Sequence, residues 1–221
     1  MTYHLARLAY YLQQGNLQSF NADYWAQVVH PKNATILMIF SFLGSGRNEN
    51  WTQLIQYSAY WLSMISVYGI SRVFNISRSG SLFSALVFGL LTTSLMEATT
   101  TQNDLLIAAL IGCSVYGVLA WGKNKGLIYL FLSIMCTSIA IGVKSSALLA
   151  LPALCSLFLI PLLQCCQLND NQSKASKLNL IFQTVIDYSK TSFTARTLVN
   201  SVAAISLFFI FTLPAGYLEN W

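Results

Sequence analysis

One stretch of the chain decides its fold class, LLIAALIGCSVYGVLAW at residues 105–121. It contains no charged residue, whereas Asp104 directly precedes it and Lys123 follows it closely. About 20 apolar residues in a helix cross a hydrocarbon core of about 30 Å. Backbone groups in lipid have to be hydrogen-bonded within the segment itself, which a helix achieves. The stretch therefore predicts a membrane-spanning α-helix.

Apolar blocks of similar length lie on both sides of this stretch. Of the 221 residues, 55% are hydrophobic and 9% are charged, whereas about 25% are charged in a soluble domain. Most of the chain therefore has no water to face, and we expect an all-α, polytopic membrane protein. The bundle occupies residues 51–221, with about six spans at 51–69, 81–96, 105–121, 127–143, 146–163 and 198–216. Because the break at Lys144 is brief, the fourth and fifth of these spans could instead form one broken element.

If six spans cross the membrane, lysine and arginine are distributed unequally between its two sides, and one side is denser in them. Basic loops stay in the cytoplasm, so we place the denser side there, with a long loop at 164–197. The net charge of +5 follows from basic loops beside anionic lipid and requires no nucleic-acid partner. The denser side holds Arg72, Arg78, Lys123, Lys125, Lys174, Lys177, Lys190 and Arg196, and the other holds Arg7, Lys32, Arg47 and Lys144.

Residues 1–50 are expected to form an external segment with two short interfacial helices. Residues 3–12 read as an amphipathic helix with Leu5, Leu8, Ala9 and Leu12 on one side. Residues 31–42 are apolar but too short to span comfortably, so we expect them to lie along the interface. A basic start followed by an apolar core is absent, so the start is not a signal peptide.

Polar residues gather at the predicted outer face in TTTQND, residues 99–104. Asp104 stands at the mouth of a span, where an ionised carboxylate is costly unless it is paired or faces a wet cavity. With Gln102 and Asn103 it is a candidate for the substrate side of a site. Asn and Asp also cap helices well, so a helix N-cap is an equally weighted alternative.

Three basic residues complete the candidate site. Lys144 interrupts an apolar stretch, and could be a lysine that snorkels to the interface, a cation for a lipid-linked phosphate or a partner for Asp104. His4 and Arg7 are three residues apart and share one helical face, although an ordinary amphipathic helix explains both. Arg and Lys bind phosphate well, so together these residues suit an anionic substrate that enters from the membrane, such as a polyprenyl-phosphate sugar.

Several short motifs bear a resemblance to one family of enzymes. They are MTYHLAR at 1–7, YLQ at 11–13, Pro31 opening an apolar helix, NWTQLIQY at 50–57, TTQND at 100–104 and GVK at 142–144. In order and spacing this set resembles the polytopic C-type-fold glycosyltransferases, the bacterial group related to protein mannosyltransferases and aminoarabinose transferases. The match covers nearly the whole chain.

The resemblance implies transfer of a sugar from a polyprenyl-phosphate donor to a lipid, glycan or protein acceptor outside the cytoplasm. It also implies a location in a bacterial plasma (inner) membrane. In such enzymes an aspartate deprotonates the acceptor hydroxyl while the phosphate leaves. It further implies that Lys144 and Arg7 face the phosphate and that His4 and Asp104 shape the site.

Two departures from the family pattern limit this expectation. The family's catalytic aspartate, in a Trp-Asp context just before the Tyr-His pair, has no counterpart before Tyr3. The acidic residue that can help to bind a divalent metal is also missing, since Pro31 is followed by Lys32, and no cysteine has metal-ligand spacing with a histidine. The chain thus resembles an internal piece of a transferase, and we assign it no catalytic residue and no metal.

The 221-residue product is therefore expected to show little or no transferase activity. Two rival functions remain. A non-catalytic membrane subunit that binds a lipid-linked sugar or a partner would need the same groups. A transporter fragment would carry polar residues at mid-depth and broken helices, whereas here the charges lie at helix ends.

Overall fold

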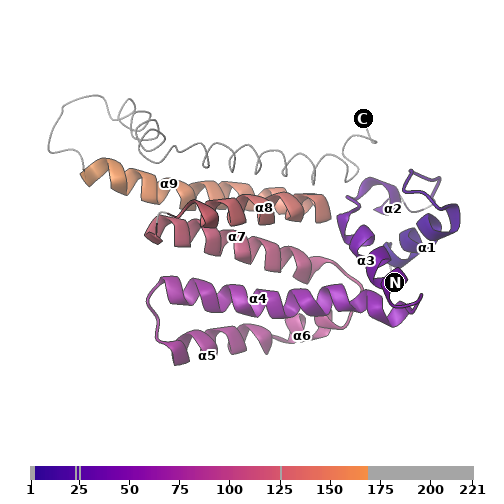
Figure 1. Cartoon of the computed structure of the whole chain (residues 1–221), viewed down its shortest axis with the longest axis horizontal. Helices are drawn as coiled ribbons and strands as arrows, with labels where there is room; N and C mark the ends of the chain where they lie inside the picture. Colours follow the sequence, from indigo (N-terminus) through magenta and orange to yellow (C-terminus); the bar gives the residue numbers. More distant parts are fainter. Residues whose placement is uncertain (1–2, 23, 25, 125, 169–221) are drawn as a thin grey trace.

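The computed structural model describes residues 3–22, 24, 26–124 and 126–168, and within these residues every regular element is a helix. The all-α prediction is therefore confirmed for this part of the chain. Figure 1 shows a bundle of long helices with a small group of short helices packed at one end. The small group consists of α1 (His4–Gln14), α2 (Ala26–Val29) and α3 (Asn33–Gly44). The bundle consists of η1 (Glu49–Gln53), α4 (Leu54–Val73), α5 (Arg78–Gly89), α6 (Thr92–Ala98), α7 (Asp104–Asn124), α8 (Leu127–Val143), η2 (Ser145–Ala150) and α9 (Leu151–Leu168).

Helix α7 lies at the centre of the bundle and packs against α4, α8 and α9 (Figure 1). The helices approach closely because small residues face one another. A Cβ atom added at Gly117 would lie 2.6 Å from the Tyr129 carbonyl oxygen on α8. The Ser114 hydroxyl lies 2.8 Å from that of Ser133 and 2.7 Å from that of Thr137. Close packing of small and hydroxyl residues is typical of helix pairs in lipid.

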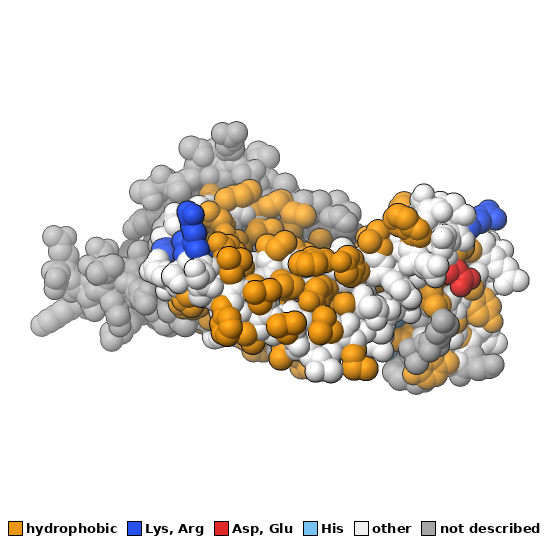
Figure 2. Space-filling model, turned by 90° about the horizontal axis from the view of Figure 1, so that it is seen from below, with side chains coloured by type: hydrophobic (Ala, Val, Ile, Leu, Met, Phe, Trp, Pro, Cys, Tyr) orange, Lys and Arg blue, Asp and Glu red, His pale blue; other side chains and the backbone are white. Residues whose placement is uncertain are grey.

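The bundle combines a core of mixed polarity with an apolar exterior. Small polar side chains lie inside it beside apolar ones such as Leu110, Ala140 and Ile141, and many large apolar side chains lie outside. The exposed fractions of Phe83 on α5, Leu90 in the break after it and Met96 on α6 are 68%, 70% and 67%. Figure 2 shows a broad apolar surface along the bundle, with a group of basic side chains at one end and a basic and an acidic side chain near the other. The buried polar residues of the bundle include Gln56, Ser63, Ser66, Ser81, Ser94, Ser114, Ser133 and Ser138.

Several predicted spans agree with the observed helices. Residues 127–143 are α8, and residues 105–121 lie within α7. The predicted first span, 51–69, begins as η1 and continues as α4 to Val73. Local apolar length was sufficient to place these elements.

The second predicted span, residues 81–96, is wrong as a single helix. It is divided into α5 and α6, which are bent by 67° at the break between them. The Tyr60 hydroxyl on α4 donates to the Gly89 carbonyl at 3.0 Å, so a contact from another helix stabilises the end of α5. A Cβ at Gly89 would lie 2.9 Å from that hydroxyl oxygen, so glycine permits the close approach.

The fifth predicted span, residues 146–163, also differs. It begins as η2 and continues as α9 to Leu168, so the loop expected from residue 164 is helical over its first residues. Lys144 is extended (φ −157°, ψ 134°), and α8 and α9 run in opposite directions in Figure 1. They are therefore two elements rather than one broken one. The sixth span (198–216) and the rest of the loop lie outside the described residues.

Within the described residues, α7 is the one helix long and apolar enough to cross a membrane, and the bent pair α5–α6 would be a second if taken together. Helices α3 and α8 are apolar but shorter. The six-span arrangement therefore stays a prediction.

The segment predicted to be external forms helices near the expected positions, but the apolar side predicted for α1 is only partly buried. The buried residues of α1 are His4, Arg7, Leu8 and Tyr11, whereas Ala9 is exposed. The physical reason is that α1 packs against α3, which offers backbone and hydroxyl partners to polar side chains. His4 and Arg7 are thus part of the interior.

Candidate functional site

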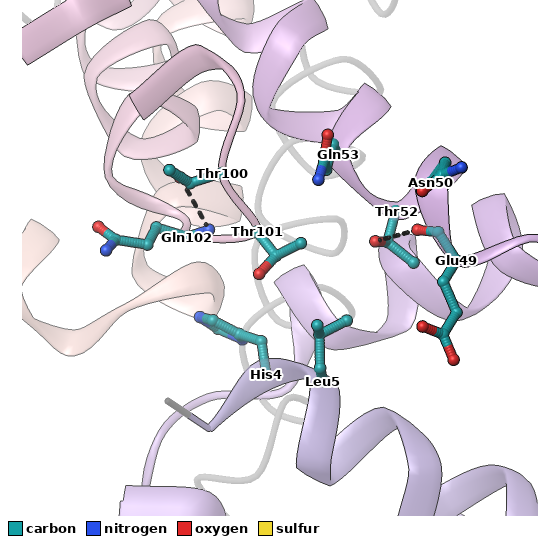
Figure 3. Close-up of a pocket in the computed structure, with 9 residues that line it drawn as sticks. All are labelled: His4, Leu5, Glu49, Asn50, Thr52, Gln53, Thr100, Thr101 and Gln102. Carbon is teal, nitrogen blue, oxygen red and sulfur yellow. Dashed lines mark hydrogen bonds between the residues drawn. The ribbon is translucent and has the colours of Figure 1, made fainter. Parts of the chain in front are cut away.

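A cavity of about 360 Å³ lies where the small helices meet the bundle. This volume falls in the range of small-molecule sites. Figure 3 shows side chains reaching it from α1, from η1 and from the loop between α6 and α7. Amides and hydroxyls predominate among them, and Glu49 supplies a carboxylate. The lining residues are His4, Leu5, Glu49, Asn50, Thr52, Gln53, Thr100, Thr101 and Gln102.

Local hydrogen bonds shape the loop that forms one wall. The Thr100 hydroxyl donates to the Glu97 carbonyl at 2.9 Å and accepts from the Gln102 amide N–H at 3.3 Å (Figure 3). Gln56 on α4 is fully buried. With its amide oriented to satisfy both groups, it donates to the Gln102 carbonyl and accepts from the Leu105 N–H, each at 3.2 Å. The loop is thereby attached to the start of α4.

An ion pair lies beside the cavity. The Lys144 Nζ is 2.7 Å from Asp104 Oδ1, and the two side chains are 29% and 42% exposed. Burial lowers the pKa of Lys144, but the hydrogen bond and the charge of Asp104 outweigh it, so the pKa lies above its ordinary value. A protonated lysine has three donors, so Lys144 retains N–H groups for an anion. Of the roles considered for Lys144, pairing with Asp104 is observed.

Asn103 connects this ion pair to the break after α8. Its side-chain amide donates to the Val143 carbonyl at 3.2 Å, and its own carbonyl accepts from the Ile107 N–H at 3.1 Å, as at a helix N-cap. The residue is 3% exposed. It therefore holds the start of α7 against the end of α8 and so places Asp104 beside Lys144.

His4 is 4% exposed and borders the cavity. Its Nδ1 lies 3.4 Å from the Thr35 hydroxyl, while its Nε2 is buried with no hydrogen-bond partner among the described residues. Burial and then the positive charge of Arg7 lower the pKa of His4 to about 4, and the opposing effect of the neighbouring Asn103 amide is smaller. His4 is therefore neutral at pH 7. In Figure 3 its ring is directed toward the loop that carries Thr101 and Gln102.

Two further ionisable groups, Glu97 and Tyr3, interact electrostatically with the ion pair. Burial raises the pKa of Glu97, as does the charge of Asp104, against the opposing charge of Lys144. Burial also raises the pKa of Tyr3, although the charges of Lys144 and Arg7 oppose it. The Tyr3 ring packs on His4 with centroids 4.0 Å apart. The start of α1 and the start of α7 thus share one electrostatic environment.

Arg7 is not among the residues that line the cavity. It is fully buried, and it donates from Nε to the Gln27 carbonyl at 2.6 Å and from Nη1 to the Pro31 carbonyl at 3.0 Å. These contacts hold α1 to the segment that precedes α3. Its proposed phosphate-side role stays a prediction. Besides the two backbone carbonyls, it contacts the Tyr3 ring, whose centroid lies 5.6 Å from Arg7 Cζ.

The structure thus brings together five of the six predicted site residues. His4 and Gln102 border the cavity, and Asn103, Asp104 and Lys144 lie beside it. Sequence reasoning did not single out Glu49 and Gln56 as site residues. Gln56 belongs to the NWTQLIQY motif, and Glu49 directly precedes it. The polar residues of this motif, at the start of a predicted span, could have indicated that the site includes them.

No group of three His, Cys, Asp or Glu side chains in the described part of the chain is arranged to hold a metal ion. Comparison with known proteins gives no match, whether to a family model, to a curated protein or to a solved structure. Functional inference therefore rests on the geometry of the cavity and of the bundle.

Proposed function

We propose that this chain is the donor-binding part of an integral membrane glycosyltransferase that uses a polyprenyl-phosphate sugar. The observation that carries the proposal is a polar cavity placed beside the Lys144–Asp104 pair at one end of an apolar helix bundle. The donor has three chemically different parts, and the molecule offers a matching surface for each.

The sugar matches the cavity. Its hydroxyls both donate and accept, as do the hydroxyls of Thr52, Thr100 and Thr101 and the amides of Gln53 and Gln102. The neutral His4 adds a buried ring nitrogen that has no hydrogen-bond partner among the described residues. A buried polar atom left unpaired costs free energy, so a ligand hydroxyl that reaches it would be favoured.

The phosphate matches Lys144. This lysine is partly exposed and protonated, and Asp104 occupies one of its three donors. Charge-assisted hydrogen bonds of ammonium to phosphate are stronger than neutral ones. Asp104 limits the excess positive charge, which favours a singly or doubly charged anion over a highly charged polymer.

The polyprenyl chain matches the outside of the bundle. Exposed Leu, Phe and Met side chains cover α5 and α6. Such a surface would face lipid, with Arg72, Arg78 and Lys123 at the cytoplasmic end and the cavity at the outer end. We propose the plasma membrane of a bacterium as its location and a glycan, lipid or protein as the acceptor.

Binding measurements on the purified chain in lipid nanodiscs test this proposal. The probes are a polyprenyl-phosphate hexose, the same polyprenyl phosphate without sugar, and an uncharged alkyl glucoside. We expect the first to bind tightest, and Lys144→Ala to weaken it roughly tenfold, as for loss of a charged hydrogen bond. Lys123→Ala, a lysine at the far end of α7, is the matched control and should bind normally. Equal binding of all three probes would contradict the proposal.

A non-catalytic subunit that binds a lipid-linked sugar is the second candidate. It is favoured by the pairing of Asp104 with Lys144, because an ion-paired carboxylate is a weak base. A transfer assay with labelled polyprenyl-phosphate sugar and purified protein separates the two. Turnover that is lost in Glu49→Gln would favour an enzyme whose base lies in this chain, and binding without turnover would favour the subunit.

A further inference from the structure

A groove of about 580 Å³ lies at the opposite end of the bundle from the cavity, between α4, α7 and α8. Its wall is mainly apolar, with Leu62, Ile65 and Leu132 along it. Arg72 and Lys123 also line it, near the ends of α4 and α7. The groove therefore combines an apolar channel with two positive charges at one end.

Apart from the two cations, the polar side chains that line the groove are uncharged, and they are Ser66, Tyr68, Tyr116 and Asn124. Ser66 is buried there, and its hydroxyl already donates to the Ser63 carbonyl at 2.7 Å. A headgroup in the groove would find its strongest donors at the basic end.

The two cations retain donors for a ligand. Lys123 Nζ donates to the Val73 carbonyl at 3.0 Å and to the Asn75 side chain, which occupies two of its three N–H groups. Arg72 donates through Nη1 to the Ile76 carbonyl and has four further N–H groups. Neither side chain forms an ion pair with a carboxylate of the described residues.

We propose that this groove binds one anionic glycerophospholipid, with its phosphate at Arg72 and Lys123 and an acyl chain along Leu62, Ile65 and Leu132. Basic pockets between membrane helices on the cytoplasmic side recognise anionic headgroups, and the charge of the groove complements such a headgroup. The inference rests on the membrane location in the proposed function. It concerns a different site, at the other membrane surface from the sugar cavity.

Native mass spectrometry of the protein released from nanodiscs tests the site. The nanodiscs contain phosphatidylglycerol and phosphatidylcholine with identical acyl chains in equal amounts. Each basic side chain near anionic lipid contributes a factor of about five in affinity, so two contribute roughly 25-fold. We expect retained lipid to be phosphatidylglycerol, and the preference to disappear in the double variant Arg72→Gln/Lys123→Gln. Arg78→Gln, at the same end but outside the groove, is the matched control and should keep the preference.

A second variant tests the apolar part without changing charge. Leu132→Trp fills the groove, and we expect it to reduce retained phosphatidylglycerol several-fold. Three results would overturn the proposal: equal retention of the two lipids by the unaltered protein, an equal loss in Arg78→Gln, or displacement of the lipid by inorganic phosphate at matched concentration. Binding of the polyprenyl-phosphate hexose, measured on the same variants, should be unchanged. Failure of the groove is thereby distinguished from failure of the proposed function.

Discussion

Asp104 and Lys144 are 40 residues apart in the chain, yet their charged atoms lie 2.7 Å apart. Each residue could be identified as unusual from sequence, because each stands at the end of an apolar stretch. Their pairing could be suggested as one of several roles but not established. Asn103 determines it by bonding the start of α7 to the Val143 carbonyl.

The ion pair should make a modest, pH-dependent contribution to stability. Partly exposed pairs contribute about 0.2–1 kcal/mol, which a double-mutant cycle of Lys144→Ala and Asp104→Asn would measure by thermal unfolding in detergent. Because the pKa of Lys144 is raised in the folded state, the coupling should be complete at pH 7 and lost as the pH rises through that pKa. Coupling that persists when lysine is neutral would contradict this origin.

His4 should make folding less stable under mildly acidic conditions. Its pKa is lowered from 6.5 to about 4 by burial, so the unfolded chain binds a proton more readily than the folded one. The stability that neutral His4 contributes to the folded state is present above pH 6.5 and is lost as the pH falls toward 4. Its upper limit is about 3 kcal/mol. Unfolding measured at intervals from pH 7 to pH 4 should show a shallower decline in His4→Gln. An identical decline in both proteins would exclude His4 as the source.

At the scale of elements, the lengths of the helices were predictable from the sequence where tertiary packing favours the same helix bounds as the local apolar pattern. Helix α8 has the predicted bounds because its apolar block ends at Lys144, which is extended. The break between α5 and α6 was not predicted from the apolar pattern. At this break the Tyr60 hydroxyl of α4 donates to the Gly89 carbonyl. Periodicity reports the local preference of a segment and contains no information on a hydroxyl from another helix.

Close packing of α7 on α8 should make Gly117 intolerant of a side chain. In Gly117→Ala the added Cβ would lie 2.6 Å from the Tyr129 carbonyl oxygen and 3.0 Å from the Ser133 backbone nitrogen. Backbone atoms cannot move aside by a rotamer change, so the helices have to separate, at a cost of about 1–3 kcal/mol. Unfolding in detergent measures the change. Gly44→Ala, where nothing lies within 4 Å of the added Cβ, is the control, and equal stability of the two variants would contradict the close approach.

At the scale of the whole molecule, charge is segregated to the two ends of the bundle. Arg72, Arg78 and Lys123 lie at the ends of α4, α5 and α7 on one side. Asp104 and Lys144 lie at the other, next to the cavity and the small helices. The helix of 21 residues between these ends has a length of about 30 Å, which equals the thickness of a hydrocarbon core.

The two ends should lie on opposite sides of a membrane. In a background with the five native cysteines replaced by serine, Asn50→Cys should react with a membrane-impermeant maleimide in intact cells. Arg78→Cys should react only after permeabilisation. Equal labelling of both positions before permeabilisation, or recovery of the protein in the soluble fraction, would contradict the proposed orientation.

The sequence alone determined the helical class, the approximate bounds of most described helices and the location of charge at their ends. These features depend on local apolar length and on backbone hydrogen bonding within each segment. Tertiary structure alone decided that α1 buries His4 and Arg7, that α5 and α6 are separate, and that Glu49 faces the cavity. Each of these depends on a partner far away in the chain, because a buried polar group is stable only where another element supplies its hydrogen bond.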